Sequence, residues 1–166
     1  MSTHFALLAA SLMFVSGTHL PQSSSTVGTA EPPILVIVSA ATPGSEIPLG
    51  TLRNAFEGYP TDFNGKRLVP FNHPTGTPTR ARFDKVLLGL VPNQVGQFWV
   101  DQLVRGGRQA PRTLPSSELA LRVVASVPGS ISYVAMVPNA LPPALKILAI
   151  DGKRPTDSHY ALGPQH

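Results

Sequence analysis

The stretch from Asn72 to Arg80, NHPTGTPTR, holds the residue types best suited to binding an anion. It leaves a predicted strand and enters a predicted helix, where the first N–H groups lack intrahelical partners and the positive end of the helix dipole points outward. Thr75 and Thr77 offer hydroxyl donors, and Gly76 lets the backbone approach a ligand closely. Arg80 adds positive charge. Two interpretations are open: an anion-binding site at this junction, or a helix that Thr77 only caps with the rest a solvated turn, and the residues alone favour the second.

A single strand-to-helix junction binds an anion only weakly, so tight binding needs a second wall, that is, further binding groups that face the anion from another part of the protein. A helix N-terminus contributes about 0.3–2 kcal/mol toward an anion, and a charge-assisted hydrogen bond about 1.5–3 kcal/mol. Micromolar affinity needs about 8 kcal/mol. Ser39 and Thr42 follow the first predicted strand, and ligands of open α/β sheets lie outside the carboxyl ends of the strands. We therefore expect Ser39 and Thr42 to complete the anion-binding site.

The sequence does not display catalytic machinery. His73 could act as a base, but no acid lies close to it in sequence and no Gly-x-Ser-x-Gly motif is present. Five acids are scattered along the chain, and most of them are interpreted as charges on helix surfaces: Glu46, Glu57, Asp62, Asp84 and Asp101. The chain has no cysteine, and its other histidines lie in the first and last segments, so no metal-ligand spacing is assembled. We expect no catalytic residue, no metal and no cofactor, and we predict that the protein is not an enzyme.

Charge gives a mild preference for anions. The formal net charge is +4, but only 13% of the residues are charged, and neither an aromatic-basic pattern nor a recognition helix for nucleic acid is present. We therefore exclude a nucleic-acid-binding function. Arg105–Arg112, RGGRQAPR, is either a grip for phosphate or an acidic partner, or an exposed loop that keeps the protein soluble. The exposed loop is the favoured interpretation.

The apolar pattern predicts strands that alternate with helices. The β-branched run at 34–40 is typical of a strand buried on both faces, and Asn64-Gly65 indicates a tight turn before a short strand at 67–71. Thr77-Pro78 starts a helix, with Thr77 as its N-cap. A further helix from Val95 to Leu103 places Phe98 and Trp99 in the core. The remaining predicted elements are a helix at 49–57 stopped by Gly58, a helix capped by Ser116 or Ser117, and strands at 131–134 and 145–150.

These elements predict an α/β fold, a three-layer sandwich around a mainly parallel sheet of about four strands. Residues 33–152 hold all of them and form one predicted domain. The tail at 153–166 has no apolar period, and we expect it to be disordered.

The N-terminal segment has the composition of a targeting sequence. Phe5–Val15 is apolar, has the length of a secretory h-region, and is too short to span a bilayer. Residues 1–25 are therefore interpreted as a signal peptide and leader, with the mature domain starting near Glu31 in the periplasm or outside the cell. The alternatives are a short buried helix and an uncleaved membrane anchor.

Several segments resemble the phosphate ABC-transporter substrate-binding protein family. LRNAFEG, which ends at Gly58, is similar to the end of a helix in that family, and PGSISYV, which ends at Val134, is similar to one of its strands. The resemblance covers Pro33–Gly152 and implies one lobe of a type II periplasmic binding protein, a short single-lobe member. It implies no catalysis.

The resemblance also implies a ligand and a partner. Thr75, Gly76 and Thr77 stand where the family has Ser, Gly and Thr against the oxyanion, and Phe71 stands in place of an arginine. The implied function is that of an exported binding protein for phosphate or a similar oxyanion, held weakly or with a partner's help. The implied partner is a membrane permease or another envelope protein. The alternative is a non-catalytic structural or interaction module that kept the fold and lost the ligand site.

Overall fold

The β-branched run ILVIVS forms β1 (Ile34–Ser39), an inner strand of a five-stranded sheet in the computed structural model, which describes residues 31–164. Both faces of β1 are covered, so its successive side chains from Ile34 to Val38 are all buried. The strand order across the sheet is β6 (Arg112–Thr113), β5 (Val69–Asn72), β7 (Ser130–Ala135), β1 and β8 (Leu145–Ile147).

The sheet is mixed. β5 pairs in parallel with β7 and with β6, whereas β1 pairs antiparallel with β7 and with β8. β1 therefore runs against the direction shared by the other strands. The predicted α/β class is confirmed, and the sheet is mixed rather than purely parallel. The additional edge strand, β6, is only two residues long and has no apolar pattern that would reveal it in the sequence.

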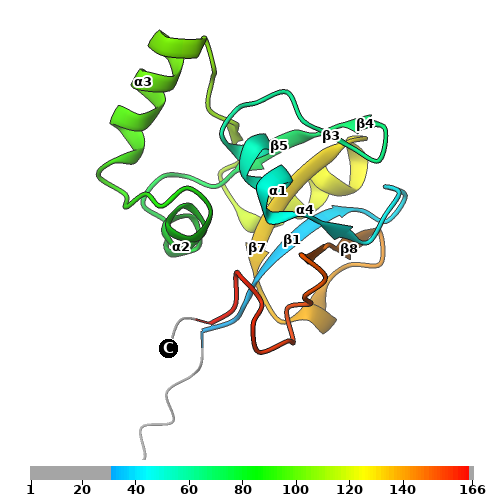
Figure 1. Ribbon diagram of the computed structural model, residues 1–166. Coiled ribbons are helices and arrows are strands. Elements are labelled where there is room, and N and C mark those ends of the chain that lie inside the picture. The colour runs from blue at the N-terminus through cyan, green and yellow to red at the C-terminus, as the bar shows by residue number, and fades with distance from the viewer. Residues whose placement is uncertain (1–30, 165–166) are drawn as a thin grey trace, which may run out of the picture.

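Helices cover both faces of the sheet and make the three predicted layers (Figure 1). On one face, α1 (Leu49–Phe56) and α2 (Pro78–Leu87) bring Phe56 and Phe83 against Val36 and Val38. On the other face, α4 (Ser117–Ser126) packs Val124 against β1, with η1 (Pro138–Ala140) in the connection that follows β7. The alternation of β1 thus supplies two separate hydrophobic clusters.

Two short pairings complete the fold. β2 (Glu46–Ile47) pairs in parallel with β9 (Ala149–Ile150), and β3 (Asp62–Phe63) pairs antiparallel with β4 (Lys66–Arg67). Asn64 and Gly65 join β3 to β4 with φ of 48° and 78°. Two successive positive φ values are the requirement of a type I′ hairpin turn, so the turn predicted from Asn-Gly is confirmed.

α3 (Val95–Gly106) forms where a helix was predicted, but the predicted core position of its aromatic residues is wrong. Val95 is the only residue of α3 that is buried. Phe98 and Trp99 are half-buried against each other, with ring centroids 5.0 Å apart, and belong to neither hydrophobic cluster. Figure 1 shows α3 standing away from the sheet. An apolar helical period indicates that a face can be covered, but not by what.

The last residues belong to the folded domain, so the prediction of a disordered tail is wrong for 153–164. Tyr160 and Leu162 are buried in the same cluster as Phe56. The Tyr160 hydroxyl donates to the carbonyl of Ile34 at 3.0 Å, and the amide of Ile34 donates to the carbonyl of Leu162 at 2.9 Å. These residues form short turns rather than a helix or a strand, so their buried positions follow no apolar period in the sequence.

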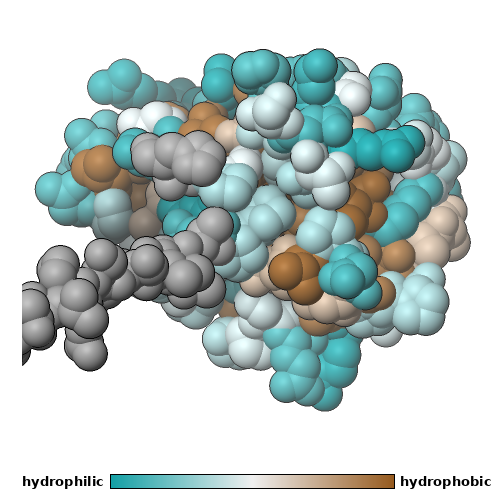
Figure 2. Space-filling view, turned by 90° about the horizontal axis from the view of Figure 1, so that it is seen from below, coloured by the Kyte–Doolittle hydropathy of each residue, from teal (hydrophilic) through white to brown (hydrophobic). Residues whose placement is uncertain are grey.

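The predicted signal peptide and leader at 1–25 lie outside the described residues. Arg82 of α2 holds the start of the described chain, because its side chain pairs with Glu31 and donates to the carbonyl of Pro32. No helix between residues 31 and 164 is long and apolar enough to cross a membrane. Seen from below, the molecule carries mostly hydrophilic side chains with apolar ones in separate groups (Figure 2).

Candidate functional site

The turn that enters α2 is shaped by Gly76 and Thr77. Gly76 has φ of 92°, and Thr77 is extended at the N-cap position before Pro78. Thr77 occupies the predicted N-cap position, but its hydroxyl does not accept a hydrogen bond from a helix amide. It donates to the carbonyl of Pro74 at 2.9 Å, and the Thr77 amide approaches the same carbonyl at 3.2 Å. The turn is therefore closed on itself, and the helix amides are left without a capping side chain.

Free backbone donors gather at the start of α2. The amides of Thr79 and Arg80 have no acceptor in the described part of the chain, and Pro78 has no N–H. Thr75 and Gly76 are exposed beside them, and a Cβ at Gly76 would meet nothing within 4 Å. No acidic residue stands in the first turn of α2. Unpaired N–H groups at the positive end of a helix are suited to an anion.

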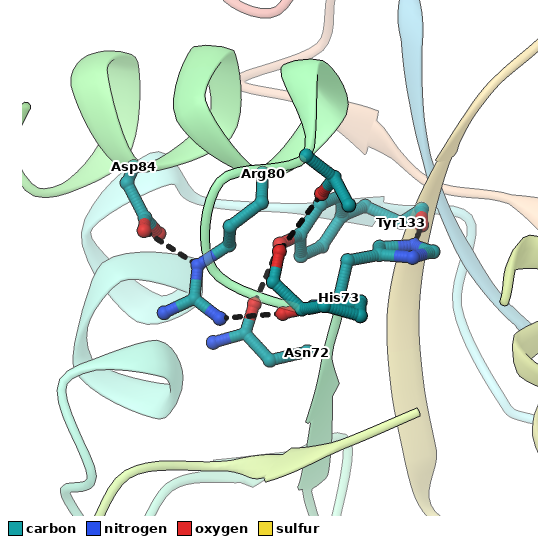
Figure 3. A network of polar contacts seen from close by, with 7 residues as sticks. Asn72, His73, Arg80, Asp84 and Tyr133 are labelled. Carbon is teal, nitrogen blue, oxygen red and sulfur yellow. Dashed lines mark hydrogen bonds and ion pairs between the residues drawn. The ribbon is translucent and has the colours of Figure 1, made fainter. Parts of the chain in front are cut away.

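Arg80 lies behind this turn and points into the protein (Figure 3). Its side chain is 4% exposed; Nε donates to Oδ2 of Asp84 at 2.5 Å, and Nη1 donates to the carbonyl of His73 at 2.9 Å. Two nitrogens of the guanidinium are thus already used within the protein. Arg80 holds the loop that leads into α2, and its charge is largely balanced by Asp84, which is 2% exposed.

Asn72 and His73 are tied to β7 by a buried network (Figure 3). The Tyr133 hydroxyl donates to Oδ1 of Asn72 at 2.5 Å, and Nε2–H of His73 donates to the Tyr133 carbonyl at 2.6 Å. The Tyr133 ring stacks on Phe83 of α2, with centroids 3.6 Å apart. β5, β7 and α2 are therefore locked together directly beneath the turn that contains Gly76.

Burial controls the protonation of this network. It lowers the pKa of His73, and the nearby charge of Arg80 lowers it further, although the bond to the Tyr133 carbonyl opposes the change. Burial also raises the pKa of Tyr133 well above its usual range. Burial raises the pKa of the Asp84 carboxyl, while the Arg80 guanidinium offsets part of the rise. A neutral, enclosed His73 that donates to a carbonyl is a structural residue.

Ser39 and Thr42 do not face the start of α2, which corrects the expectation of a joint site. β1 is antiparallel to β7, whereas β5 is parallel to β7. The carboxyl end of β1 therefore lies beside the amino end of β5, at the opposite end of the strands from the start of α2. Ser39 and Thr42 instead line a pocket of about 260 Å³ that also contains Lys66. The rule used in the prediction holds for strands that run in the same direction.

The arginines of 105–112 belong to different parts of the fold: Arg105 lies in α3, Arg108 in the loop that follows, and Arg112 in β6. Arg108 lies over the ring of Tyr59, 4.2 Å from its centroid, and donates to Gln102. Arg112 belongs to β6, where it pairs with Phe71 of β5. Within residues 31–164, no three His, Asp or Glu side chains come together as a metal site would require.

Sequence reasoning missed the inward-facing acid of the network. Asp84 is one of the scattered acids, most of which are predicted to lie on helix surfaces, but it is buried against Arg80. The four-residue spacing between Arg80 and Asp84 was the available signal, because side chains at i and i+4 lie on one helix face. Tyr133 had no such local signal, since its partners lie about sixty residues away in sequence.

Comparisons with known proteins give a match in fold. No family model matches the sequence, and no curated protein shows a significant match. An ABC-type phosphate transport receptor from Vibrio cholerae superposes with a TM-score of 0.59 at 13% identity, covering 76% of this chain and 49% of that one. A putative phosphate ABC transporter substrate-binding protein with bound phosphate from Clostridium perfringens gives 0.56 at 16% identity, covering 75% and 47%.

A possible phosphate-binding protein from Planctomyces limnophilus gives a TM-score of 0.54 at 12% identity, covering 82% of this chain and 46% of that one. The chain thus spans about half the length of the solved structures that it matches. The resemblance drawn from sequence segments is confirmed for the fold: this chain is similar to about half of such a binding protein.

Proposed function

We propose that this chain is a binding-type domain that holds phosphate or a similar oxyanion weakly at the start of α2. The observation that carries the proposal is the exposed turn at Thr75 and Gly76, beside the unpaired amides of Thr79 and Arg80. The names of the matched structures supply the class of ligand, since each is described as a phosphate transport or phosphate-binding protein. No catalysis is part of this function.

We expect weak binding, because all the groups that contact the anion come from one side, the turn before α2 and the first amides of α2. Hydrogen bonds to a charged group contribute about 1.5–3 kcal/mol each, and a helix N-terminus contributes about 0.3–2 kcal/mol. Ser39 and Thr42 lie at the opposite end of the strands and add nothing to this site. The remaining contributions support an affinity nearer to millimolar, about 4 kcal/mol, than to micromolar. Tight capture then requires a second wall from another protein.

The proposed setting is the cell envelope. The apolar segment Phe5–Val15 supports export to the periplasm or outside the cell. The matched proteins are transport receptors or substrate-binding proteins of the ABC type, which supports a membrane permease or another envelope protein as the partner.

The test is an NMR titration of the full chain with phosphate, and separately with sulfate, at constant ionic strength. We expect saturable shifts of the backbone amides from Thr75 to Arg80, with a dissociation constant in the millimolar range. Thr75→Glu should abolish them, because the added carboxylate repels the anion while an acid at a helix N-terminus keeps the fold stable. Thr156→Glu, at another exposed site, changes the net charge equally and should leave the shifts intact.

Titration to tens of millimolar without saturable shifts contradicts ligand binding by this chain alone. That result leaves the structural or interaction module as the function to pursue. Shifts that persist in Thr75→Glu place the anion elsewhere and contradict the site at the start of α2.

A further inference from the structure

The pocket that contains Ser39 and Thr42 gathers hydrogen-bond donors at the carboxyl end of β1. These two residues begin and end the turn that follows β1, in which the Thr42 amide donates to the Ser39 carbonyl at 2.9 Å. Ser126, the last residue of α4, and Gly129, which precedes β7, also line the pocket. Lys66 of β4 adds an ammonium group. Segments far apart in the sequence thus contribute donors to one pocket.

Two of these donors are buried and unpaired. Thr42 is 6% exposed, and its hydroxyl makes no hydrogen bond within residues 31–164. Gly129 is buried, and its amide meets no acceptor in the described part of the chain, although its carbonyl accepts from the amide of Val69 at 2.9 Å. Buried N–H groups without a partner are rare in proteins. The pocket therefore offers donors for an acceptor that the chain itself does not supply.

The turn from Val127 to Ser130 explains the free amide of Gly129. Pro128 occupies its second position, and Gly129 at the third has φ of 77°, which are features of a type II turn. In this turn the amide of Ser130 donates to the carbonyl of Val127 at 3.2 Å, and the amide of Gly129 is left over.

The charge of the pocket favours an anion. None of the residues that line it, all within 31–164, is acidic. The ammonium of Lys146 lies near Lys66 in the same region, because it donates to the carbonyl of Thr42. The end of α4 has the opposite polarity, but the Ser130 hydroxyl donates to the carbonyl of Val127 at 2.6 Å and offsets part of it. Donors next to positive charge match a ligand that only accepts hydrogen bonds.

The size and lining of the pocket indicate a small organic anion. Its volume of about 260 Å³ is below the range of about 300–1,000 Å³ for drug-sized ligands, and well above the roughly 30 Å³ of one water. Ala41, Ala125 and Pro128 give it apolar surface beside the donors. An inorganic oxyanion would leave that apolar surface uncovered.

We propose that this pocket binds a small monocarboxylate. Thr42, Gly129 and Lys66 hold the carboxylate, and the alanine and proline side chains contact its short apolar chain. The inference does not rest on the proposed function, because the two sites lie apart. In Figure 1 the β3–β4 hairpin, which carries Lys66, is on the opposite side of the molecule from α2.

The test is an NMR titration of the full chain with butyrate, and separately with its neutral isostere butyramide, at neutral pH and constant ionic strength. We expect saturable shifts of the amides of Thr42 and Gly129 with butyrate, and none with butyramide, at a millimolar dissociation constant. Thr42→Val keeps the branched shape, removes the hydroxyl and should raise the dissociation constant about tenfold. Lys66→Met should raise it about threefold.

Lys153→Met is the matched control for Lys66→Met, because Lys153 is exposed and lies outside the pocket. It should leave the dissociation constant unchanged, and so should Thr75→Glu, which disrupts only the proposed site at α2. Far-UV circular dichroism confirms that each variant is folded.

Titration with butyrate to tens of millimolar without saturable shifts at Gly129 overturns the proposal, as do equal shifts with butyramide. Binding that Thr42→Val and Lys66→Met leave unchanged places the carboxylate elsewhere and also overturns it. Loss of the butyrate shifts in Thr75→Glu would show that butyrate binds at α2 instead.

Discussion

At the scale of single residues, the Arg80–Asp84 ion pair controls how the turn before α2 is held. Both side chains are nearly excluded from water, and Oδ1 of Asp84 has no hydrogen-bond partner in the described chain. Removal of one member of a buried pair leaves the other charge unpaired, which costs about 3–5 kcal/mol. We therefore expect Asp84→Ala to lower the free energy of unfolding by about that amount in urea denaturation.

The double variant Arg80→Met with Asp84→Leu removes both charges and should be closer to the parent than Asp84→Ala is. Glu118→Ala breaks the exposed pair with Arg122, which has the same spacing, and should change stability by no more than about 0.5 kcal/mol. Equal losses in Asp84→Ala and Glu118→Ala would contradict the importance assigned to burial.

His73 gives the stability a dependence on pH in the acid range. Because burial holds its pKa below the ordinary value of 6.5, the unfolded chain binds a proton first as the pH falls. The contribution of neutral His73 is therefore present above pH 6.5 and is lost progressively below it. We expect the urea midpoint to fall from pH 7.5 to pH 5, with a smaller fall in His73→Gln.

His159→Gln is the control for this experiment, because His159 is exposed. It should keep the pH dependence of the parent. A fall of the same size in His73→Gln as in the parent would assign the dependence to other groups.

At the scale of elements, α4 shows what a single cap contributes. The Ser116 side chain accepts from the amide of Leu119 at 3.1 Å, so Ser116 rather than Ser117 is the cap, of the two that the sequence offered. Ser116→Ala should lower the free energy of unfolding by about 1 kcal/mol, because that amide is left without a capping acceptor. Ser117→Ala, at the next position, removes no such bond and should change stability by less than about 0.5 kcal/mol. Urea denaturation checks both, and equal effects would contradict the assigned cap.

Elements with a local signal could be predicted from the sequence. β1 follows from its β-branched run, α2 from Thr77-Pro78, and α4 from its serine cap. The exposed position of α3 could not be predicted, because an apolar period is the same whether or not another element covers it. β6 could not be predicted either, since its two residues are defined only by pairing with β5.

The candidate site also has a part that could be predicted from local sequence and a part that could not. The turn at Thr75–Thr77 lies within a short stretch of chain, and its unpaired helix amides follow from the start of any helix. The place of Ser39 depends on the direction of β1 within the sheet, which is decided by pairing with β7 and β8. The contact between Tyr133 and Asn72 depends on the same non-local pairing.

At the scale of the whole molecule, the C-terminal segment closes the hydrophobic core. Leu162 is 1% exposed, and the backbone of Ile34 is hydrogen-bonded to Leu162 and to the Tyr160 hydroxyl on this segment. Residues near both ends of the described chain therefore meet beside β1, where Arg82 pairs with Glu31 and donates to the carbonyl of Gly163.

This closure predicts that the domain cannot be shortened to residue 152. Leu162→Ala should lower the free energy of unfolding by about 2–5 kcal/mol, the range for removal of a buried leucine side chain. Deletion of residues 153–166 should cost more, because it also removes Tyr160 and its bond to Ile34. Lys153→Ala, at an exposed position of the same segment, is the control and should change the free energy of unfolding by less than about 0.5 kcal/mol. A chain ending at Gly152 that unfolds at the same urea concentration as the parent would show that the segment is not part of the cooperative unit.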